Sequence, residues 1–416
     1  MEITKNSAGL LEKIDAAYAR IRDDIYKTPI VKAKRISRQI ACTDIFLKLE
    51  NVQSTGSFKI RGAMNAVRLR QKKDATFVTA SAGNHGLGVA YSAWLCGARA
   101  EIFMPTTTPL TKQRAVEQYT DKIHLVGKSF QETNDIALKF CAQKGCNYIH
   151  PYNDLDVVAG QGTMGLEIIK QMGSHPPDMV FVPVGGGGLI AGVATVLKQK
   201  WPRVKVIAVE PRNVPSFSTS LKRKKVTRIT PKPTIADGVA VAQVGSEVFP
   251  INKELVDDVW LVSEEYVAKA IVRFVEDSRI VAEGAGACGL GAILEKTDAD
   301  PDAVAGQRLL VIVSGGNLDI NALSVLLQRG LVIEGRVSHY QFSGLDRPGT
   351  LAQITRSFAE AGVNILDLEH SRFSGRIRVG MTMVDVFVET RGPAHQEELL
   401  NHLKNLGHEV ELIREI

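Results

Sequence analysis

Short apolar runs rich in valine and isoleucine alternate with amphipathic stretches along most of the chain. This rhythm predicts strands that alternate with helices. The predicted opening helix carries Leu10, Ile14, Ala17 and Ile21 at helical spacing. The predicted strands are 44–50, 75–81, 98–105, 122–127, 146–151, 178–184, 204–211 and 308–316, and the stretches 86–97 and 109–119 are predicted helices. Such an order is typical of a largely parallel sheet with both faces covered.

The pattern changes after Leu331. Alternating stretches at 337–345, 363–372, 378–390 and 409–413 are interrupted by amphipathic stretches at 350–362 and 395–407. This β-α-β-β-α-β order in about 80 residues predicts a ferredoxin-like domain. We therefore predict a first region over 1–328, a linker over 329–336 and a second domain over 337–416.

Composition indicates a soluble globular enzyme or binding protein of two or three domains, because 416 residues with 44% hydrophobic and 23% charged positions exceed one ordinary core. The formal charge of +6 is small for this length. The basic run Lys222-Arg223-Lys224-Lys225 has no aromatic residues among it, which favours a solvated loop. We expect no nucleic-acid partner.

The cysteines and the N-terminus bear on location. Five scattered cysteines without a C-x-x-C pair favour reduced thiols and no zinc site. The first residues are charged and lack an apolar leader, and no stretch approaches the ~18 apolar residues of a membrane span. We therefore expect a cytoplasmic protein that does not contact membranes.

Two glycine-rich turns follow predicted strands. The first contains Ser81, Ala82, Gly83, Asn84 and His85. Its backbone N–H groups at a helix start suit a carboxylate, although such a turn is about as often an ordinary loop. The second contains Gly185, Gly186, Gly187 and Gly188. Four glycines in a row indicate a ligand close to the main chain, and a phosphate at the helix start fits.

The second turn also permits a different function. Gly186 to Ala191 reads G-x-G-x-x-A, and Glu210 ends the next strand at the distance of a ribose-binding carboxylate. A nicotinamide-dependent oxidoreductase is therefore an alternative. Its motif lies in the middle of an established α/β run, which weighs against it.

A serine and a lysine complete the candidate chemistry. Ser314, at the carboxyl end of a buried strand, points to the crevice where open α/β sheets bind ligands, although it could equally cap the next helix. Lys59 stands in "STGSFKIRGA" between an aromatic residue and small residues. From this stretch alone it is a phosphate ligand, a nucleophile or a surface lysine.

Taken together, these stretches resemble the fold-type II pyridoxal-phosphate (PLP) enzymes, in particular the threonine/serine dehydratase group that includes serine racemase. The resemblance covers about residues 10–325 and rests on "SFKIRGA", "SAGNHG", "AGQGT", "GGGGL", "IADGVAV", "EGAGA" and "SGGN". It implies a tryptophan-synthase-β-like fold of two α/β subdomains, with the smaller one at roughly 50–153.

The resemblance also implies a cofactor site. The residues that it assigns to PLP are Phe58, Lys59, Asn84, Gly185, Gly186, Gly187, Gly188, Leu189, Gly238 and Ser314. Lys59 would form the Schiff base, Phe58 and Gly238 would lie on the two faces of the ring, and the glycine run would bind the phosphate. Asn84 would contact the 3-oxygen and Ser314 the pyridine nitrogen, while Ser81 to His85 would bind the substrate carboxylate.

The residue chemistry agrees with an eliminating enzyme. Burial beside Phe58 and the nearby cation Arg61 are expected to lower the pKa of Lys59, which makes it a nucleophile and a base. A serine hydroxyl at the ring nitrogen is a weaker proton donor than an aspartate, which favours elimination over transamination.

Two departures separate the chain from the racemase pattern. Serine racemase has a second acid/base where this chain has Ala82, so we expect a dehydratase. Ser216 replaces the aspartate that accompanies a cation-binding glutamate, here Glu210, so we expect no metal.

The C-terminal stretch "SGLDRPGTLAQITRSFAEAGVNI" resembles the ACT-domain pattern. By resemblance, Asp346, Gly349 and Asn364 would contact an amino-acid effector, such as isoleucine or valine, at an interface between two such domains. An equally open alternative is that the domain only dimerises the enzyme. Either implies a homo-oligomer, a homodimer or homotetramer.

The leading hypothesis is therefore a PLP-dependent threonine dehydratase that also accepts serine, with a place in isoleucine biosynthesis. The alternatives are a serine dehydratase or racemase, the nicotinamide-dependent oxidoreductase, and a non-catalytic amino-acid sensor.

Overall fold

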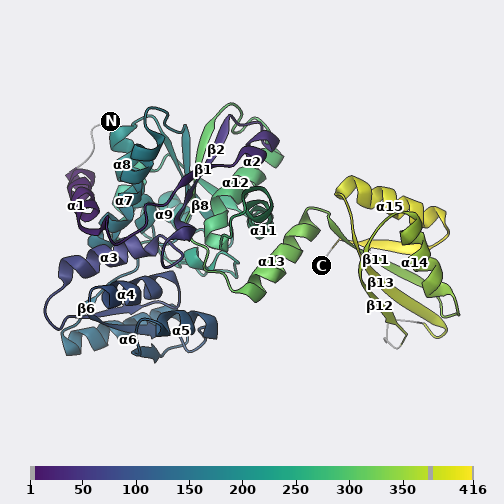
Figure 1. Ribbon diagram of the computed structural model, residues 1–416, viewed down its shortest axis with the longest axis horizontal. Coiled ribbons are helices and arrows are strands. Elements are labelled where there is room, and N and C mark those ends of the chain that lie inside the picture. The colour runs from purple at the N-terminus through teal and green to yellow at the C-terminus, as the bar shows by residue number, and fades with distance from the viewer. Residues whose placement is uncertain (1–4, 373–377, 415–416) are drawn as a thin grey trace. The chain divides into compact units, whose positions relative to one another are not determined.

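The computed structural model describes residues 5–372 and 378–414. The chain divides into two compact units, residues 1–320 and 321–416, whose elements are drawn in Figure 1. The division falls at the start of helix α13 (Ile320–Ile333). The domain limits at 328 and 337 therefore stay predictions.

A six-stranded sheet forms the centre of the first unit. Its strands, in spatial order, are β1 (Ile30–Lys32), β2 (Asp44–Leu49), β10 (Arg308–Val313), β7 (Met179–Pro183), β8 (Lys205–Pro211) and β9 (Asp258–Val262). Only the edge strand β1 is antiparallel to its neighbour, and the others run parallel. The largely parallel sheet predicted from the valine and isoleucine runs is confirmed.

A second, smaller sheet follows β2 in the chain. It contains β5 (Ile123–Leu125), β4 (Arg99–Met104), β3 (Thr76–Ala80) and β6 (Asn147–Tyr148), all parallel. Three helices pack on this sheet: α4 (Asn84–Leu95), α5 (Leu110–Glu117) and α6 (Phe130–Lys144). Ser129 caps the start of α6 by accepting a hydrogen bond from Glu132 N, and Gly145 ends α6 with a left-handed backbone.

The other helices of the first unit surround the larger sheet and connect it to the smaller one. They are α1 (Lys5–Ile21), α2 (Lys34–Gln39), α3 (Lys59–Arg70), α7 (Leu155–Met172), α8 (Gly188–Lys200), α9 (Ser216–Lys222), α10 (Phe249–Leu255), α11 (Glu264–Arg273) and α12 (Gly284–Ala299), with the 3₁₀ turns η1 (Glu50–Val52) and η2 (Asp237–Val239) and the π-helical turn η3 (Phe274–Ser278). None of the described helices is long and apolar enough to span a bilayer.

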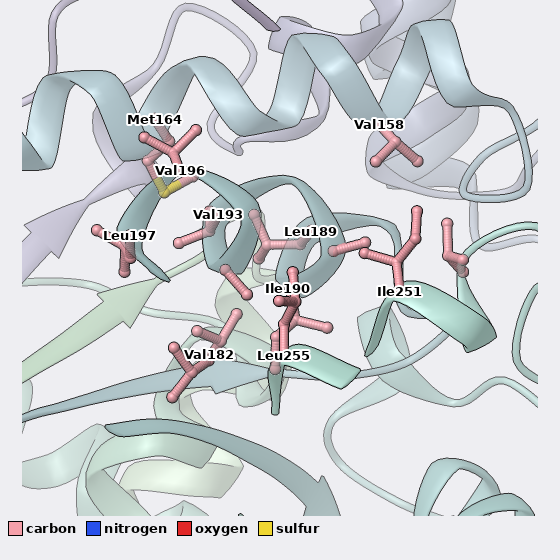
Figure 2. Packing of buried hydrophobic residues seen from close by; sticks show 14 of the residues in the cluster. Val158, Met164, Val182, Leu189, Ile190, Val193, Val196, Leu197, Ile251 and Leu255 are labelled. Atoms are coloured by element: carbon pink, nitrogen blue, oxygen red, sulfur yellow. The ribbon is translucent and has the colours of Figure 1, made fainter. Parts of the chain in front are cut away.

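The main core forms around α8. Figure 2 shows Leu189, Ile190 and Val193 of α8 among Val158 of α7 and Val182 of β7, and all five are at most 5% exposed. Burial of so many apolar side chains is the main stabilising contribution to this unit.

Glycines allow the helices around this core to approach closely. A Cβ atom on Gly192 of α8 would lie 2.6 Å from the backbone N of Gly162 of α7. A Cβ on Gly160 would lie 2.4 Å from the carbonyl oxygen of Arg61 in α3. The motif "AGQGT" therefore packs α7 against α3 and α8.

The second unit has the β-α-β-β-α-β order predicted from the sequence. Its elements after α13 are β11 (Val337–Leu345), α14 (Thr350–Glu360), β12 (Ile365–Ser371), β13 (Met381–Glu389), α15 (Pro393–Asn405) and β14 (Glu409–Ile413). The sheet order is β12-β13-β11-β14, with every pair antiparallel. Alternate residues such as Tyr340, Phe342 and Val386 are buried under the helices with Phe358 and Leu403.

Candidate active site

Lys59 is the first residue of α3, directly after Phe58. Its amine donates a hydrogen bond to the carbonyl oxygen of Pro151 at 3.1 Å and lies 5.1 Å from the centre of the Phe58 ring. Burial lowers the pKa of Lys59 to about 8, and the nearby carboxyl of Glu283 opposes this shift. A lysine with this pKa has a substantial neutral fraction near physiological pH, which suits a nucleophile or a base.

The loop before Lys59 is bound to the loop that follows β10. Phe58 N donates to Ser314 O at 3.0 Å, and Ser57 and Gly315 form an antiparallel bridge. These bonds bring Ser314 beside the lysine although the two lie far apart in sequence. The Ser314 side chain is 2% exposed and makes no hydrogen bond to another described residue. Its hydroxyl is therefore available to a ligand.

Asn84 begins α4 and is held from both ends of its amide. Its Nδ2 donates to Glu283 Oε1 at 2.8 Å, while its Oδ1 accepts from Asn317 Nδ2, also at 2.8 Å. Nδ2 retains one further proton for a ligand.

Glu283 was not among the residues singled out from the sequence. Burial raises the pKa of Glu283 to about 7, the negative charge of Asp237 adds to this shift, and the bond from Asn84 opposes it. The only sequence signal was its place before the small residues of "EGAGA".

The glycine run lies between β7 and α8. Gly187 has φ +92°, and Asn252 Nδ2 donates to its carbonyl oxygen at 3.0 Å. A Cβ on Gly186 would lie 2.0 Å from Cγ of Tyr152, so this position has no space for a side chain. The backbone N–H groups of Gly186, Gly187 and Gly188 donate no hydrogen bond to another described residue.

This cradle fits the phosphate of PLP. Unpartnered N–H groups at a helix start, next to the positive end of the helix dipole, are the donors that a phosphate requires. Leu189 follows them and is 5% exposed. The chemistry of the donors therefore matches the cofactor that the resemblance implies.

Gly238, in η2, lies near Glu283. A Cβ at this position would lie 3.1 Å from Ala285 Cβ and 3.4 Å from Glu283 Oε1. A side chain here would be tight against Ala285 and in ordinary contact with the carboxyl group that accepts from Asn84. The expected place of Gly238 near the cofactor ring stays a prediction.

The loop from Ser81 to His85 connects β3 to α4. Gly83 N donates to Ser81 Oγ at 3.2 Å, and Ala82 is half-buried. His85 is buried, and its Nε2 lies 3.1 Å from Ile149 O. Burial lowers the pKa of His85 to about 3, with smaller effects of the same sign from Lys59 and His150, so the ring is neutral. Only the backbone and the smaller side chains of this loop remain for a substrate carboxylate.

One expectation about Lys59 was wrong. The sequence suggested that Arg61 would lower the lysine's pKa as a neighbouring cation. The structure turns the Arg61 side chain into the interior, where Glu50 and Glu167 neutralise its charge. The groups that shift the pKa of Lys59 are instead the buried surroundings and Glu283.

Glu210 is fully buried at the end of β8. Its two oxygens accept backbone N–H groups of Phe217 at 2.7 Å and Ser218 at 2.8 Å, at the start of α9. Burial raises the pKa of Glu210 to about 7, although these bonds oppose the shift. With both oxygens engaged by α9, Glu210 is unsuited to bind a ribose, which weighs against the nicotinamide alternative. The described residues contain no cluster of three metal-binding side chains.

The candidate effector residues of the second unit do not meet within one chain. Gly349, with φ +97°, precedes α14, and Asp346 N donates to Gly380 O beside the end of β11. Asn364 contacts Glu389, which pairs with the first residue of β11. The nine residues of β11 separate these places by roughly 25 Å at the rise of an extended strand. One small ligand can contact both only across two copies of the domain.

Comparisons with known proteins agree with this geometry. Residues 21–315 match the family described as pyridoxal-phosphate dependent enzyme, and residues 341–408 match the ACT domain. L-threonine ammonia-lyase of Thermotoga maritima is 39% identical over 407 residues, which cover 97% of this chain and 99% of the relative.

Two solved structures are similar to more than three quarters of this chain. Threonine deaminase isoform 2 of Solanum lycopersicum is 35% identical, with a TM-score of 0.72 over 79% of this chain and 89% of that one. Maize serine racemase is 31% identical, with a TM-score of 0.71 over 77% and 97%.

The fold class and the family inferred from the motifs are thereby confirmed. The chain belongs to the pyridoxal-phosphate-dependent enzyme family, within its fold-type II group, and carries an ACT domain at its C-terminal end.

Proposed function

We propose that the protein is a PLP-dependent threonine ammonia-lyase, which converts L-threonine to 2-oxobutyrate and ammonia and L-serine to pyruvate and ammonia. The observation that carries this proposal is the meeting of Lys59, Asn84, Ser314 and the glycine run at one end of the two sheets. The relatives named L-threonine ammonia-lyase, which match nearly the whole chain, support it.

PLP, when bound, withdraws electrons from the substrate and so acidifies its α-hydrogen. Lys59 would hold the cofactor through its amine and, once released from it, would accept the α-proton at Nζ, because its lowered pKa makes a neutral amine available. The backbone N–H groups of Gly186 to Gly188, which donate to no other described residue, would bind the phosphate. Asn84 would orient the ring through the proton that its Nδ2 does not give to Glu283.

Ser314 and Ala82 determine the outcome of the reaction. The Ser314 hydroxyl would face the ring nitrogen as a weaker proton donor than an aspartate, which would favour loss of the β-hydroxyl over transamination. Ala82 has no proton to give to the opposite face of the substrate. We therefore propose elimination, with racemisation as a minor activity at most.

The second unit would bind an amino-acid effector between two copies of the ACT domain, with Asp346 and Gly349 from one copy and Asn364 from the other. Isoleucine and valine are the first effectors to test, consistent with a role in isoleucine biosynthesis. This arrangement requires at least a homodimer. The five free cysteines are consistent with the cytoplasmic location expected from the sequence.

Purified protein tests the central proposal directly. It should bind PLP and release 2-oxobutyrate from L-threonine, and Lys59→Ala should abolish both the covalent attachment of PLP and turnover. Borohydride treatment should fix the cofactor on Lys59. The matched control is Lys27→Ala, at an exposed position outside the site, which should leave both unchanged. A protein that stays inactive on threonine and serine with PLP added would overturn the proposal.

A further inference from the structure

Four buried charged side chains form a network around Arg61, which stands two residues after Lys59. Lys48 of β2, Glu50 of η1, Arg61 of α3 and Glu167 of α7 are each at most 3% exposed. Their two positive and two negative charges balance. We call these four residues the buried ion network.

Arg61 lies at the centre of this network and uses every N–H of its guanidinium. Its Nε and Nη2 donate to the two oxygens of Glu50, both at 2.7 Å. Its Nη1 and Nη2 donate to Glu167 at 2.8 and 2.9 Å, and Nη1 also donates to Thr163 Oγ1 at 3.3 Å. Two carboxylates thus bind one planar cation with two bonds each, which fixes its orientation as well as its charge.

The Glu50–Arg61 pair closes a loop that contains Lys59. The loop runs from the end of β2 to the first turn of α3, and it includes Phe58 and the residues tied to Ser314. The start of α3 has no side-chain cap, because Phe58 occupies the N-cap position and accepts no bond through its side chain. Arg61 therefore ties this first turn to the protein interior in place of a cap.

The other side of the same turn is held by close backbone packing. Gly160 of α7 leaves no space between its Cα and the carbonyl of Arg61, since a Cβ there would lie 2.4 Å away. The α3 backbone is thus held against α7, while the Arg61 side chain binds back to Glu50. Both contacts act on Arg61, and Lys59 lies two residues before it in the same helical turn.

Stability alone does not account for such a network. The desolvation of buried ion pairs offsets most of their attraction, and apolar side chains of similar volume often serve as well. Directional pairs instead select one arrangement of the backbone. We propose that Glu50 and Arg61 are positioning residues, whose bidentate pair closes the loop from 51 to 60 and holds the Lys59 amine in the site.

This inference rests on the proposed role of Lys59, but its test does not require turnover. The comparison is between Glu50→Gln and Glu167→Gln. Both substitutions are isosteric, both remove one bidentate carboxylate from Arg61, and both leave the network with one excess positive charge. Only Glu50 lies at the base of the Lys59 loop.

Three quantities should be measured on each variant. The first is the pH dependence of Lys59 labelling by an amine-reactive reagent in cofactor-free protein, followed by peptide mass spectrometry. The second is the dissociation constant of PLP, and the third is the melting temperature. For Glu50→Gln we expect release of the loop to outweigh the excess positive charge, so that the labelling midpoint of Lys59 rises by about one pH unit toward that of an exposed lysine. We also expect PLP affinity to fall about tenfold.

For Glu167→Gln we expect a similar loss of melting temperature with the Lys59 midpoint and PLP affinity close to wild type. Equal effects of the two variants on labelling and affinity, or a wild-type midpoint in Glu50→Gln, would overturn the inference. If the wild type lacks turnover and the two variants still differ in Lys59 labelling as expected, the result would count against the proposed reaction and leave the positioning role supported.

If Glu50→Gln does not fold, Arg61→Lys becomes the test variant and Arg70→Lys its control, and the same three quantities are measured. Arg70 pairs with Asp154 and Asp156, both at 2.7 Å, at the opposite end of α3. Arg61→Lys keeps the charge and loses the bidentate geometry, so it should shift the labelling of Lys59, whereas Arg70→Lys should not. The same labelling midpoint in both variants would reject the proposal.

Discussion

The side-chain amide of Asn84 donates a hydrogen bond to the carboxyl of Glu283, with 2.8 Å between Nδ2 and Oε1. Asn84 begins the helix that follows β3 of the smaller sheet, and Glu283 precedes α12 of the larger one. The bond therefore joins the two halves of the candidate active site. Because burial raises the pKa of Glu283 to about 7, its carboxyl is about half protonated at neutral pH.

The first prediction concerns stability and pH at Glu283. A raised carboxyl pKa favours the folded state at low pH, and this contribution is lost as pH rises from the ordinary value of 4.5 through about 7. The loss is on the order of 3 kcal/mol. Glu283→Gln keeps an oxygen for Asn84 and removes the titration. Its melting temperature should fall less between pH 5 and pH 8 than that of the wild type, and parallel curves would contradict this assignment.

The second prediction concerns the attachment of PLP to Lys59. Only the neutral amine attacks the cofactor, and the pKa of Lys59 is about 8. The rate of attachment should therefore rise with pH to a plateau, with a midpoint near pH 8, as measured by stopped-flow absorbance on cofactor-free protein. Glu283→Gln should shift this midpoint to lower pH, because the Glu283 carboxylate opposes the lowering of the lysine's pKa. A midpoint near 10.5 in the wild type would show that the amine is exposed.

The third prediction concerns the phosphate cradle. A methyl group in Gly186→Ala would lie 2.0 Å from the Tyr152 ring and must displace either the ring or the glycine loop. We expect PLP affinity to fall by about tenfold or more, measured by fluorescence titration. Gly9→Ala is the control, because nothing lies within 4 Å of its added methyl. Wild-type affinity in Gly186→Ala would show that this loop does not contact the phosphate.

The fourth prediction concerns the shared effector site. Asp346→Ala and Asn364→Ala should each abolish the binding of isoleucine or valine, measured by calorimetry. In a heterodimer of the two variants, one interface carries both native residues and the other carries both alanines. Binding should return there at half the wild-type stoichiometry. A heterodimer that binds nothing would exclude a site shared between Asp346 and Asn364.

Local sequence patterns predicted the elements well. The valine-rich runs became β7, β8 and β10, whose residues are almost all buried, because such runs form strands covered on both faces. The change to alternation after Leu331 predicted the antiparallel sheet of the second unit for a similar reason: one face packs on helices and the other does not.

Side-chain direction was beyond these patterns. Arg61 stands two residues after Lys59, yet the helix turns it toward Glu50 and Glu167, so it does not act on the lysine amine. Glu283 acts on that amine although the two lie far apart in sequence. Likewise, "AGQGT" was only one of the motifs of the resemblance, and the structure shows that its glycines serve the contact between helices.

The sequence by itself determined the order of strands and helices, the glycine turns and the set of residue types that PLP chemistry requires, because each depends on neighbours along the chain. Only the tertiary structure decided which groups surround Lys59, which carboxylates neutralise Arg61, and that Asp346 and Asn364 lie at opposite ends of one domain. These relationships depend on distance and burial between segments remote in sequence, and both arise only when the sheets and helices pack.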